Sequence, residues 1–284
     1  MNKVFILTLC LLGITGAAQA DRWDFLPPTP LFNPLIGDLR EPQDAIIAPL
    51  NEGVYDGAIG QTVEVIQWQS NATTKWAWGI EGACFLELGS LGNAIFPLYV
   101  SDWYLGTYFS ERSGNFSNRL EFEHVSSHLG DYLFDQYQYD SQSGNWVLLD
   151  PRIIYSRESL RYTASYDFSE NFRLYGGPCY WTHLSPDSGD SRFFFHAGAE
   201  FYTDYFHFIL GTRGRGYFTY DLKVLGEAGG VVDQTFEIGF QWRWKRDSHQ
   251  SVRMAALYYT GNSPYGQFFQ LPENYLGLGI FFDP

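Results

Sequence analysis

Beyond its first twenty residues, the sequence has no apolar run long enough to cross a bilayer as a helix. Such a helix needs roughly 20 consecutive apolar residues. A chain without one can span a membrane only as a closed barrel, because closure satisfies every backbone group in lipid. The shortage of long apolar runs therefore leaves two classes open, a non-membrane protein and a membrane β-barrel.

Basic residues and cysteines are also few. Lys and Arg number 18 against 32 Asp and Glu, which gives a formal net charge of −14. Nucleic-acid binding relies on Lys and Arg neutralising phosphates, so this balance argues against a nucleic-acid partner. It also disfavours an anion-selective pore. Outside the first twenty residues, only Cys84 and Cys179 remain, and they are predicted to face opposite sides of a sheet as two free thiols.

Motifs that bind common cofactors are missing as well. The sequence has no phosphate-binding glycine loop, no zinc-ligand spacing and no dinucleotide fingerprint. The glycine-rich stretch Gly211–Gly216 follows an aromatic segment and is predicted to enter a loop. The sequence therefore gives no reason to require a cofactor.

The N-terminus has the features of a secretory signal peptide. Lys3 supplies a positive start, Val4–Gly13 is apolar, and Ala18-Gln-Ala20 is a small-residue cleavage site. We expect residues 1–20 to be the signal peptide. Residues 21–44, which are rich in proline, are expected to form a periplasmic lead, and residues 45–284 a barrel in the bacterial outer membrane.

A period-two alternation of apolar and polar residues repeats from about residue 60 to the end. In Thr235–Lys245, for example, Phe236, Ile238 and Phe240 alternate with polar residues. Successive side chains of a strand point to opposite faces, so each such segment has an apolar and a polar face. Aromatic residues make up 19% of the chain, which suits the aromatic girdles of a barrel. We predict an all-β, antiparallel transmembrane β-barrel of about 12 strands, with a range of 10–14.

Strand and loop positions follow from the alternation. The candidate strands lie near 45–52, 61–70, 75–88, 97–110, 116–128, 152–166, 171–182, 191–202, 205–212, 234–245, 251–260 and 273–282. Long polar loops are expected at 129–150, 213–233 and 261–272, and short turns at 70–74, 167–170 and 203–204. The last strand, Tyr275–Phe282, is expected to engage the barrel-assembly machinery. Inward positions carry both arginine and glutamate, which predicts a salt-bridged, filled lumen.

One polar group interrupts the predicted lipid face. In the strand at 116–128, the parity of Leu120 and Phe122 continues into His124, Ser126 and His128. On the next strand, Ser156 and Glu158 share the face of Leu160 and Tyr162. Neighbouring strands lie about 4.8 Å apart, so Ser126, His124 and Glu158 are predicted to be neighbours in the outer half of the membrane.

These residue types suit acyl transfer on a membrane lipid. A serine hydroxyl becomes a nucleophile when an imidazole takes its proton, and an acid then holds the imidazole tautomer. We predict Ser126 as nucleophile, His124 as base and Glu158 as the orienting acid. Ser156, Ser127 and His128 are predicted to support them. The partners would be outer-membrane lipids.

The His-x-Ser pair resembles that of outer-membrane phospholipase A and of the lipid A deacylase of outer membranes. In those families both residues face lipid on one strand, and a third group comes from the next strand. The chain departs from them in two ways. Ser127 and His128 stand where those families have Asn and Gly. Their third residue comes about fourteen positions after the histidine, where this chain has Gln138.

A wider resemblance covers nearly the whole chain from about residue 30. It rests on five segments: Pro34–Pro42, Glu123–Asp131, Arg173–Gly177, Gly261–Phe268 and the Leu-Gly-Leu-Gly run at 276–279. These segments are similar to an uncharacterised bacterial family, the domain of unknown function numbered 1207. The resemblance implies a secreted, single-domain envelope protein of unassigned activity.

Three functional classes remain open from the sequence. The first is a lipid-acting serine hydrolase, and the second is a passive, narrow channel. The third is a structural or surface-binding barrel that acts through the loops at 129–150 and 213–233, with His124 and Glu158 as a structural pair. Asp131, with Asp135 and Asp140, offers oxygen ligands for calcium, but such sites need six or more oxygens and the sequence does not assemble them.

Overall fold

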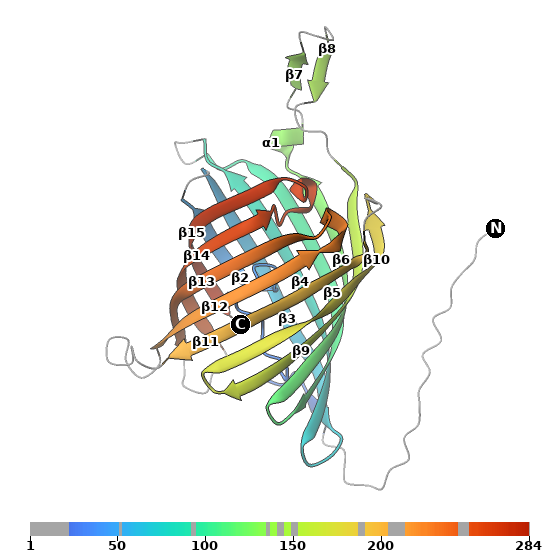
Figure 1. Ribbon diagram of the computed structural model, residues 1–284, viewed down its shortest axis with the longest axis vertical. Coiled ribbons are helices and arrows are strands. Elements are labelled where there is room, and N and C mark those ends of the chain that lie inside the picture. The colour runs from blue at the N-terminus through green and yellow to red at the C-terminus, as the bar shows by residue number, and fades with distance from the viewer. Residues whose placement is uncertain are drawn as a thin grey trace, which may run out of the picture.

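The protein is a tilted, closed barrel in this computed structural model (Figure 1). The structure describes residues 23–50, 53–91, 95–134, 137–140, 145–148, 153–186, 191–203, 214–243 and 250–283. The predicted signal peptide, residues 1–20, lies outside the described residues. No helix in the described part of the chain is long and apolar enough to cross a membrane.

Within the described residues the main sheet has 13 strands, and it closes because β3 pairs with both β2 and β4 while β15 pairs with β2. All pairings are antiparallel. β1 (Trp23–Phe25) covers only the far end of β3. The other strands form the barrel that the alternation predicted: β2 (Asp44–Pro49), β3 (Val54–Gln69), β4 (Thr74–Gly89), β5 (Leu98–Ser113), β6 (Phe116–Leu129), β9 (Tyr155–Ser169), β10 (Phe172–Ser185), β11 (Phe193–Thr203), β12 (Gly214–Leu225), β13 (Val231–Arg243), β14 (Ser251–Asn262) and β15 (Pro272–Asp283).

The two faces of each strand differ as the alternation predicted. On β13, Phe236, Ile238 and Phe240 are exposed on the outside, while Glu237 and Gln241 are buried in the lumen. A water-soluble surface rarely exposes so continuous an apolar belt. The belt and the polar interior together make this an outer-membrane-type β-barrel. The thiols of Cys84 and Cys179 are both free.

One predicted loop is a strand. The ninth predicted strand, 205–212, lies outside the described residues, whereas β12 occupies part of the predicted loop 213–233. The alternation of β12 is hard to recognise because aromatic residues lie on both faces. Tyr217 is buried in the lumen, while Phe218 is exposed on the outside. The 3-10 turn η2 (Gly226–Ala228) then connects β12 to β13.

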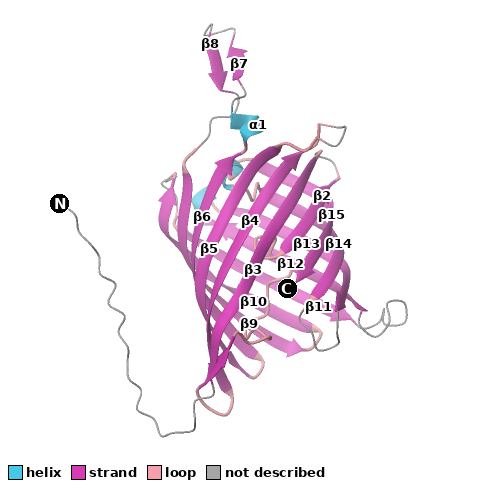
Figure 2. Ribbon diagram, turned by 180° about the vertical axis from the view of Figure 1, so that it is seen from behind, coloured by secondary structure: helices cyan, strands magenta, loops and turns pink. Residues whose placement is uncertain are grey.

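The proline-rich lead, expected in the periplasm, instead passes through the barrel. Between β1 and β2, residues 26–43 form a lumen segment without strand structure. Its side chains Leu31, Phe32 and Leu35 are buried. Figure 2 shows loop-coloured chain inside the barrel wall. The sequence did not reveal this because a segment without periodicity carries no signal of where it packs.

Ion pairs and hydrogen bonds hold the lumen segment in place. Arg119 binds Glu41 through two hydrogen bonds of 2.8 and 2.9 Å. Arg173 donates to the backbone oxygens of Pro34 and Asn33 at 3.0 and 2.8 Å. The barrel interior is therefore salt-bridged, as the inward arginines and glutamates predicted, and the lumen segment occupies part of it.

Asp38 is the most heavily paired residue of the lumen segment. Its carboxylate lies 2.5 Å from Lys223 Nζ, 3.6 Å from Arg161 and 3.8 Å from His196. Burial alone would raise the pKa of Asp38, but the charges of Lys223, His196 and Arg161 together hold it well below its usual range.

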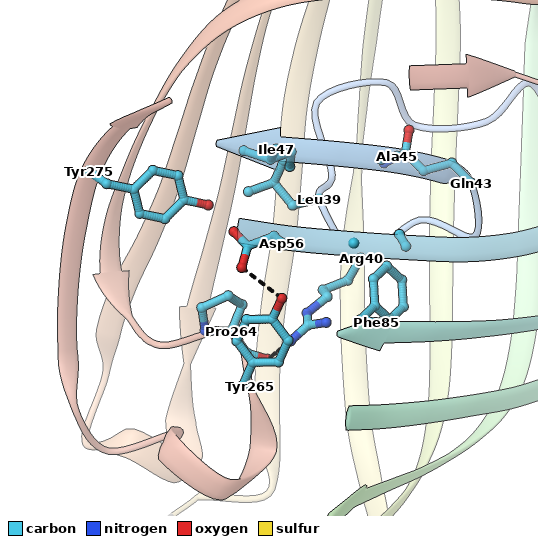
Figure 3. A pocket seen from close by; sticks show the side chains of 12 residues that line it. Leu39, Arg40, Gln43, Ala45, Ile47, Asp56, Phe85, Pro264, Tyr265 and Tyr275 are labelled. Atoms are coloured by element: carbon cyan, nitrogen blue, oxygen red, sulfur yellow. Dashed lines mark hydrogen bonds between the residues drawn. The ribbon is translucent and has the colours of Figure 1, made fainter. Parts of the chain in front are cut away.

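One end of the lumen is covered by the connection between β14 and β15. Its 3-10 turn η3 (Gly266–Phe268) folds inward, and Arg40 of the lumen segment bonds both Asp102, at 3.0 Å, and the Pro264 oxygen. Figure 3 shows Arg40 between the rings of Phe85 and Tyr265. A cavity of only about 30 Å³ remains there. We call this end of the barrel the loop end, and α1 (Asp131–Phe134) lies beside it. The short strands β7 (Tyr137–Asp140) and β8 (Asn145–Leu148) lie beyond it (Figure 1).

Candidate functional site

The predicted site lies where β6 and β9 pair, near the loop end. The register places His124 opposite Glu158 and Ser126 opposite Ser156. On the same outward faces, Leu120, Phe122 and Leu160 are exposed, and the residues between them are buried in the lumen. The parity of both strands therefore places Ser126, His124, Ser156 and Glu158 on the outside of the barrel.

His124 and Glu158 are in contact. His124 Nδ1 lies 3.2 Å from Glu158 Oε1, and because a carboxylate only accepts, the ring nitrogen donates. The two side chains are 44% and 30% exposed, so both can be reached from outside. With Nδ1 carrying the proton, Nε2 is the basic nitrogen of the ring.

Ser126 is the next outward residue of β6 after His124. Residues two apart on a strand lie about 6.8 Å apart along it. Over the described residues, no hydrogen bond joins the Ser126 hydroxyl to His124. The structure thus brings together two of the three predicted residues by direct contact and places the third beside them on one face.

The supporting residues divide between the two faces. Ser156 and the exposed His128 lie outward with Ser126. Ser127 points into the lumen instead, where its hydroxyl accepts a hydrogen bond of 3.0 Å from the backbone N–H of Gln267. The prediction that Ser127 supports the outward site is therefore wrong, because adjacent residues of a strand face opposite sides.

The family of the chain can be stated from sequence comparison. The family model described as "Protein of unknown function (DUF1207)" matches residues 17–283. The chain belongs to this DUF1207 family. No curated protein matches it.

Solved structures similar to this DUF1207 barrel include outer-membrane phospholipases. One is the Salmonella typhi outer membrane phospholipase dimer with bound calcium, at 12% identity, covering 85% of this chain and 90% of that chain, with a TM-score of 0.54. Another is outer membrane phospholipase A from Escherichia coli, at 12% identity, covering 85% and 96%, with a TM-score of 0.53. At this identity the likeness concerns the fold.

A second histidine, which the sequence analysis missed, joins the DUF1207 site. His183 Nδ1 of β10 lies 4.0 Å from Glu158 Oε2, so Glu158 stands between two imidazoles. The register of β10 shifts between Trp181 and His183, which places His183 opposite Glu158. A bulge changes which residues share a face, and period-two counting from the sequence does not detect it.

Apolar side chains surround the site on the outside. On β5, Trp103 is opposite Ser126 and Leu105 is opposite His124, and both are well exposed. With Phe122 and Leu160 they form a surface that suits acyl chains. A lipid ester bond lying against this surface would therefore meet the hydroxyl and the imidazole directly.

The proposed calcium ligand Asp131 is the exposed first residue of α1. Asp135 lies outside the described residues, as does the side chain of Asp140. Within the described part of the chain, the acidic group whose oxygens converge closely enough for a metal is Glu81, Glu121 and Glu123, inside the lumen.

Proposed function

We propose that this protein is an outer-membrane barrel that hydrolyses acyl ester bonds of membrane lipids at its outward face. The observation that carries the proposal is the His124–Glu158 hydrogen bond, next to Ser126 on a face open to lipid. An acid that orients an imidazole beside a hydroxyl is the arrangement that activates a serine. The signal peptide of residues 1–20 would direct the chain to the envelope.

In the proposed reaction, the Ser126 oxygen attacks the ester carbonyl carbon while His124 Nε2 takes the hydroxyl proton. Glu158 stabilises the imidazolium and holds its orientation. Collapse of the tetrahedral intermediate breaks the ester C–O bond, and His124 returns the proton to the leaving alcohol. A water molecule, deprotonated by His124, then releases the fatty acid and restores the Ser126 hydroxyl.

The fold comparison supports this proposal. The similar structures are named as outer membrane phospholipases, which act on lipid esters from a barrel. A fold alone does not determine a function, so the proposed hydrolysis rests on the side chains of β6 and β9.

The direct test is Ser126→Ala in the purified barrel, assayed for fatty-acid release from phospholipid in mixed detergent micelles. We expect turnover to fall by about 10³-fold or more, because the nucleophile is lost. The matched control is Ser117→Ala, a lumen-facing serine of the same strand, which should retain turnover. Full activity in Ser126→Ala would refute the proposal.

Of the two non-enzymatic alternatives, the contents of the lumen disfavour a passive channel more than a structural or surface-binding barrel. A passive channel needs an open path, whereas the lumen segment lies inside the barrel and η3 covers its loop end. A structural or surface-binding barrel remains the second candidate, because the His124–Glu158 pair could also fix β6 to β9. Wild-type protein that releases no fatty acid from any membrane lipid would favour it.

A further inference from the structure

We propose that the lumen contains a binding site for an oxygen-preferring divalent cation, formed by Glu81 of β4 and by Glu121 and Glu123 of β6. One carboxylate oxygen from each lies within 4.8 Å of the others. The site is on the opposite side of the barrel wall from His124 and Ser126. It does not depend on the proposed hydrolase activity.

A glycine makes the convergence of these carboxylates sterically feasible. Gly106 of β5 lies opposite both Glu81 and Glu123 in the strand register, so the three residues form one row across the wall. A Cβ atom at position 106 would lie 2.5 Å from Glu81 Oε1. Because Gly106 has no side chain, Glu81 reaches across β5 toward the carboxylates of β6.

Glu81 is the residue that points to a ligand. It is only 5% exposed, and neither of its carboxylate oxygens has a hydrogen-bond partner among the described residues. Glu121 and Glu123, in contrast, accept hydrogen bonds from Arg161 at 2.7–3.0 Å. A buried carboxylate without a donor is costly, and a bound cation would supply the missing counter-charge.

The side chains around the site carry more negative than positive charge, which favours a bound divalent cation. Over the described residues, five carboxylates of one connected network face three cationic side chains; they are Asp38, Glu41, Glu81, Glu121 and Glu123 against Arg119, Arg161 and Lys223. His196 and Asp221 extend this network, because His196 lies 3.8 Å from Asp38 and 2.6 Å from Asp221, and together they add no net positive charge. Two negative charges remain uncompensated, which a divalent cation would balance.

The donor set indicates which cations would bind. Three carboxylates offer only hard oxygen ligands, which suit Ca²⁺, Mg²⁺ or Mn²⁺ and not metals that prefer sulfur or imidazole. By linking β4 to β6 across Gly106, the cation would stabilise the wall of the barrel. The expected consequence of binding is therefore a rise in thermal stability.

The test is isothermal titration calorimetry of the full mature chain in detergent, stripped with chelator and titrated separately with Ca²⁺, Mg²⁺ and Mn²⁺. We expect saturable binding of at least one ion, with a matching rise in Tm. Glu81→Gln, which keeps the shape and removes the charge, should weaken binding by about 10-fold or more. Glu64→Gln is the matched control, because Glu64 is equally buried in the lumen but accepts three hydrogen bonds.

Gly106→Ala provides a second variant in case Glu81→Gln fails to fold. It keeps every carboxylate but displaces Glu81, so it should also weaken binding while Glu64→Gln does not. The proposal is overturned if the wild-type chain binds none of the three ions. It is equally overturned if both Glu81→Gln and Gly106→Ala bind them like the wild type.

Discussion

Glu158 occupies a central place on the outward surface because two imidazoles approach it, His124 at 3.2 Å and His183 at 4.0 Å. A carboxylate in hydrogen-bond contact with Nδ1 fixes the tautomer in which Nε2 is the base. At the scale of single residues, the proposed hydrolysis depends on the hydrogen bond between His124 and Glu158. It can therefore be tested by removing the charge of Glu158.

Glu158→Gln should lower the turnover of lipid ester hydrolysis by about 10²–10⁴-fold, with KM changed little, because the amide no longer favours the reactive tautomer or the imidazolium. Fatty-acid release measured across a range of lipid concentrations separates kcat from KM. Glu111→Gln is the control, since Glu111 lies on β5 near the opposite end and bonds Asn118. Unchanged turnover in Glu158→Gln would mean that the His124–Glu158 pair is structural.

Much of this site could be predicted from the positions of individual residues along their strands. Parity placed His124 and Ser126 outward, and counting from the turns placed Glu158 at the height of His124. His183 was missed because a register shift in β10 determines its position. Period-two counting assumes a regular strand, so it loses accuracy wherever a bulge adds a residue.

Among the elements, the lumen segment and β12 are the two that the sequence placed wrongly. The lumen segment has no strand periodicity, yet its polar groups match cationic side chains of the wall, including Arg119, Arg173 and Lys223. β12 was misplaced for a different reason, because aromatic residues on both faces conceal its alternation. The elements that were predicted well are those in which one face is uniformly apolar.

The pairing of Asp38 predicts how the stability of the lumen segment depends on pH. Its pKa is lowered in the folded protein, so its contribution to stability is fully present above the unfolded pKa of about 3.9. The contribution is lost as the pH falls from there toward the lower folded pKa. Asp38→Asn should therefore reduce the free energy of unfolding at neutral pH, by about 3 kcal/mol for loss of one partner in a buried ion pair.

The measurement is urea unfolding of wild type and Asp38→Asn between pH 3 and pH 8, followed by tryptophan fluorescence. The difference between the two should be constant above about pH 5 and should shrink at lower pH. Asp24→Asn, a change in the exposed β1, serves as the control. A difference that grows as the pH falls would contradict the proposed pairing.

On the scale of the whole molecule, the lumen segment fills part of the barrel interior, and the outer surface carries the polar site. At the loop end η3 and Arg40 leave only a small cavity, whereas at the opposite end a cavity of about 1060 Å³ lies beside the lumen segment. The larger cavity is lined by several arginines and by residues of the lumen segment. The interior is therefore a vestibule closed at one end, and the lumen segment forms much of its inner wall.

Removal of the lumen segment should convert this closed vestibule into a wider path for ions through the barrel. In planar bilayers we expect low single-channel conductance from the wild type and a clear increase when residues 26–43 are replaced by a short glycine–serine linker. Arg119, Arg161 and Lys223 would lose the carboxylates of Glu41 and Asp38, but Glu81, Glu121 and Glu123 would remain in the wall to balance them, so we expect higher conductance without anion selectivity. A double variant, Asp38→Asn with Glu41→Gln, keeps the segment and separates lost charge from lost bulk. If the deletion folds and conducts no better than the wild type, then η3 and the arginine–glutamate network of the wall close the lumen by themselves.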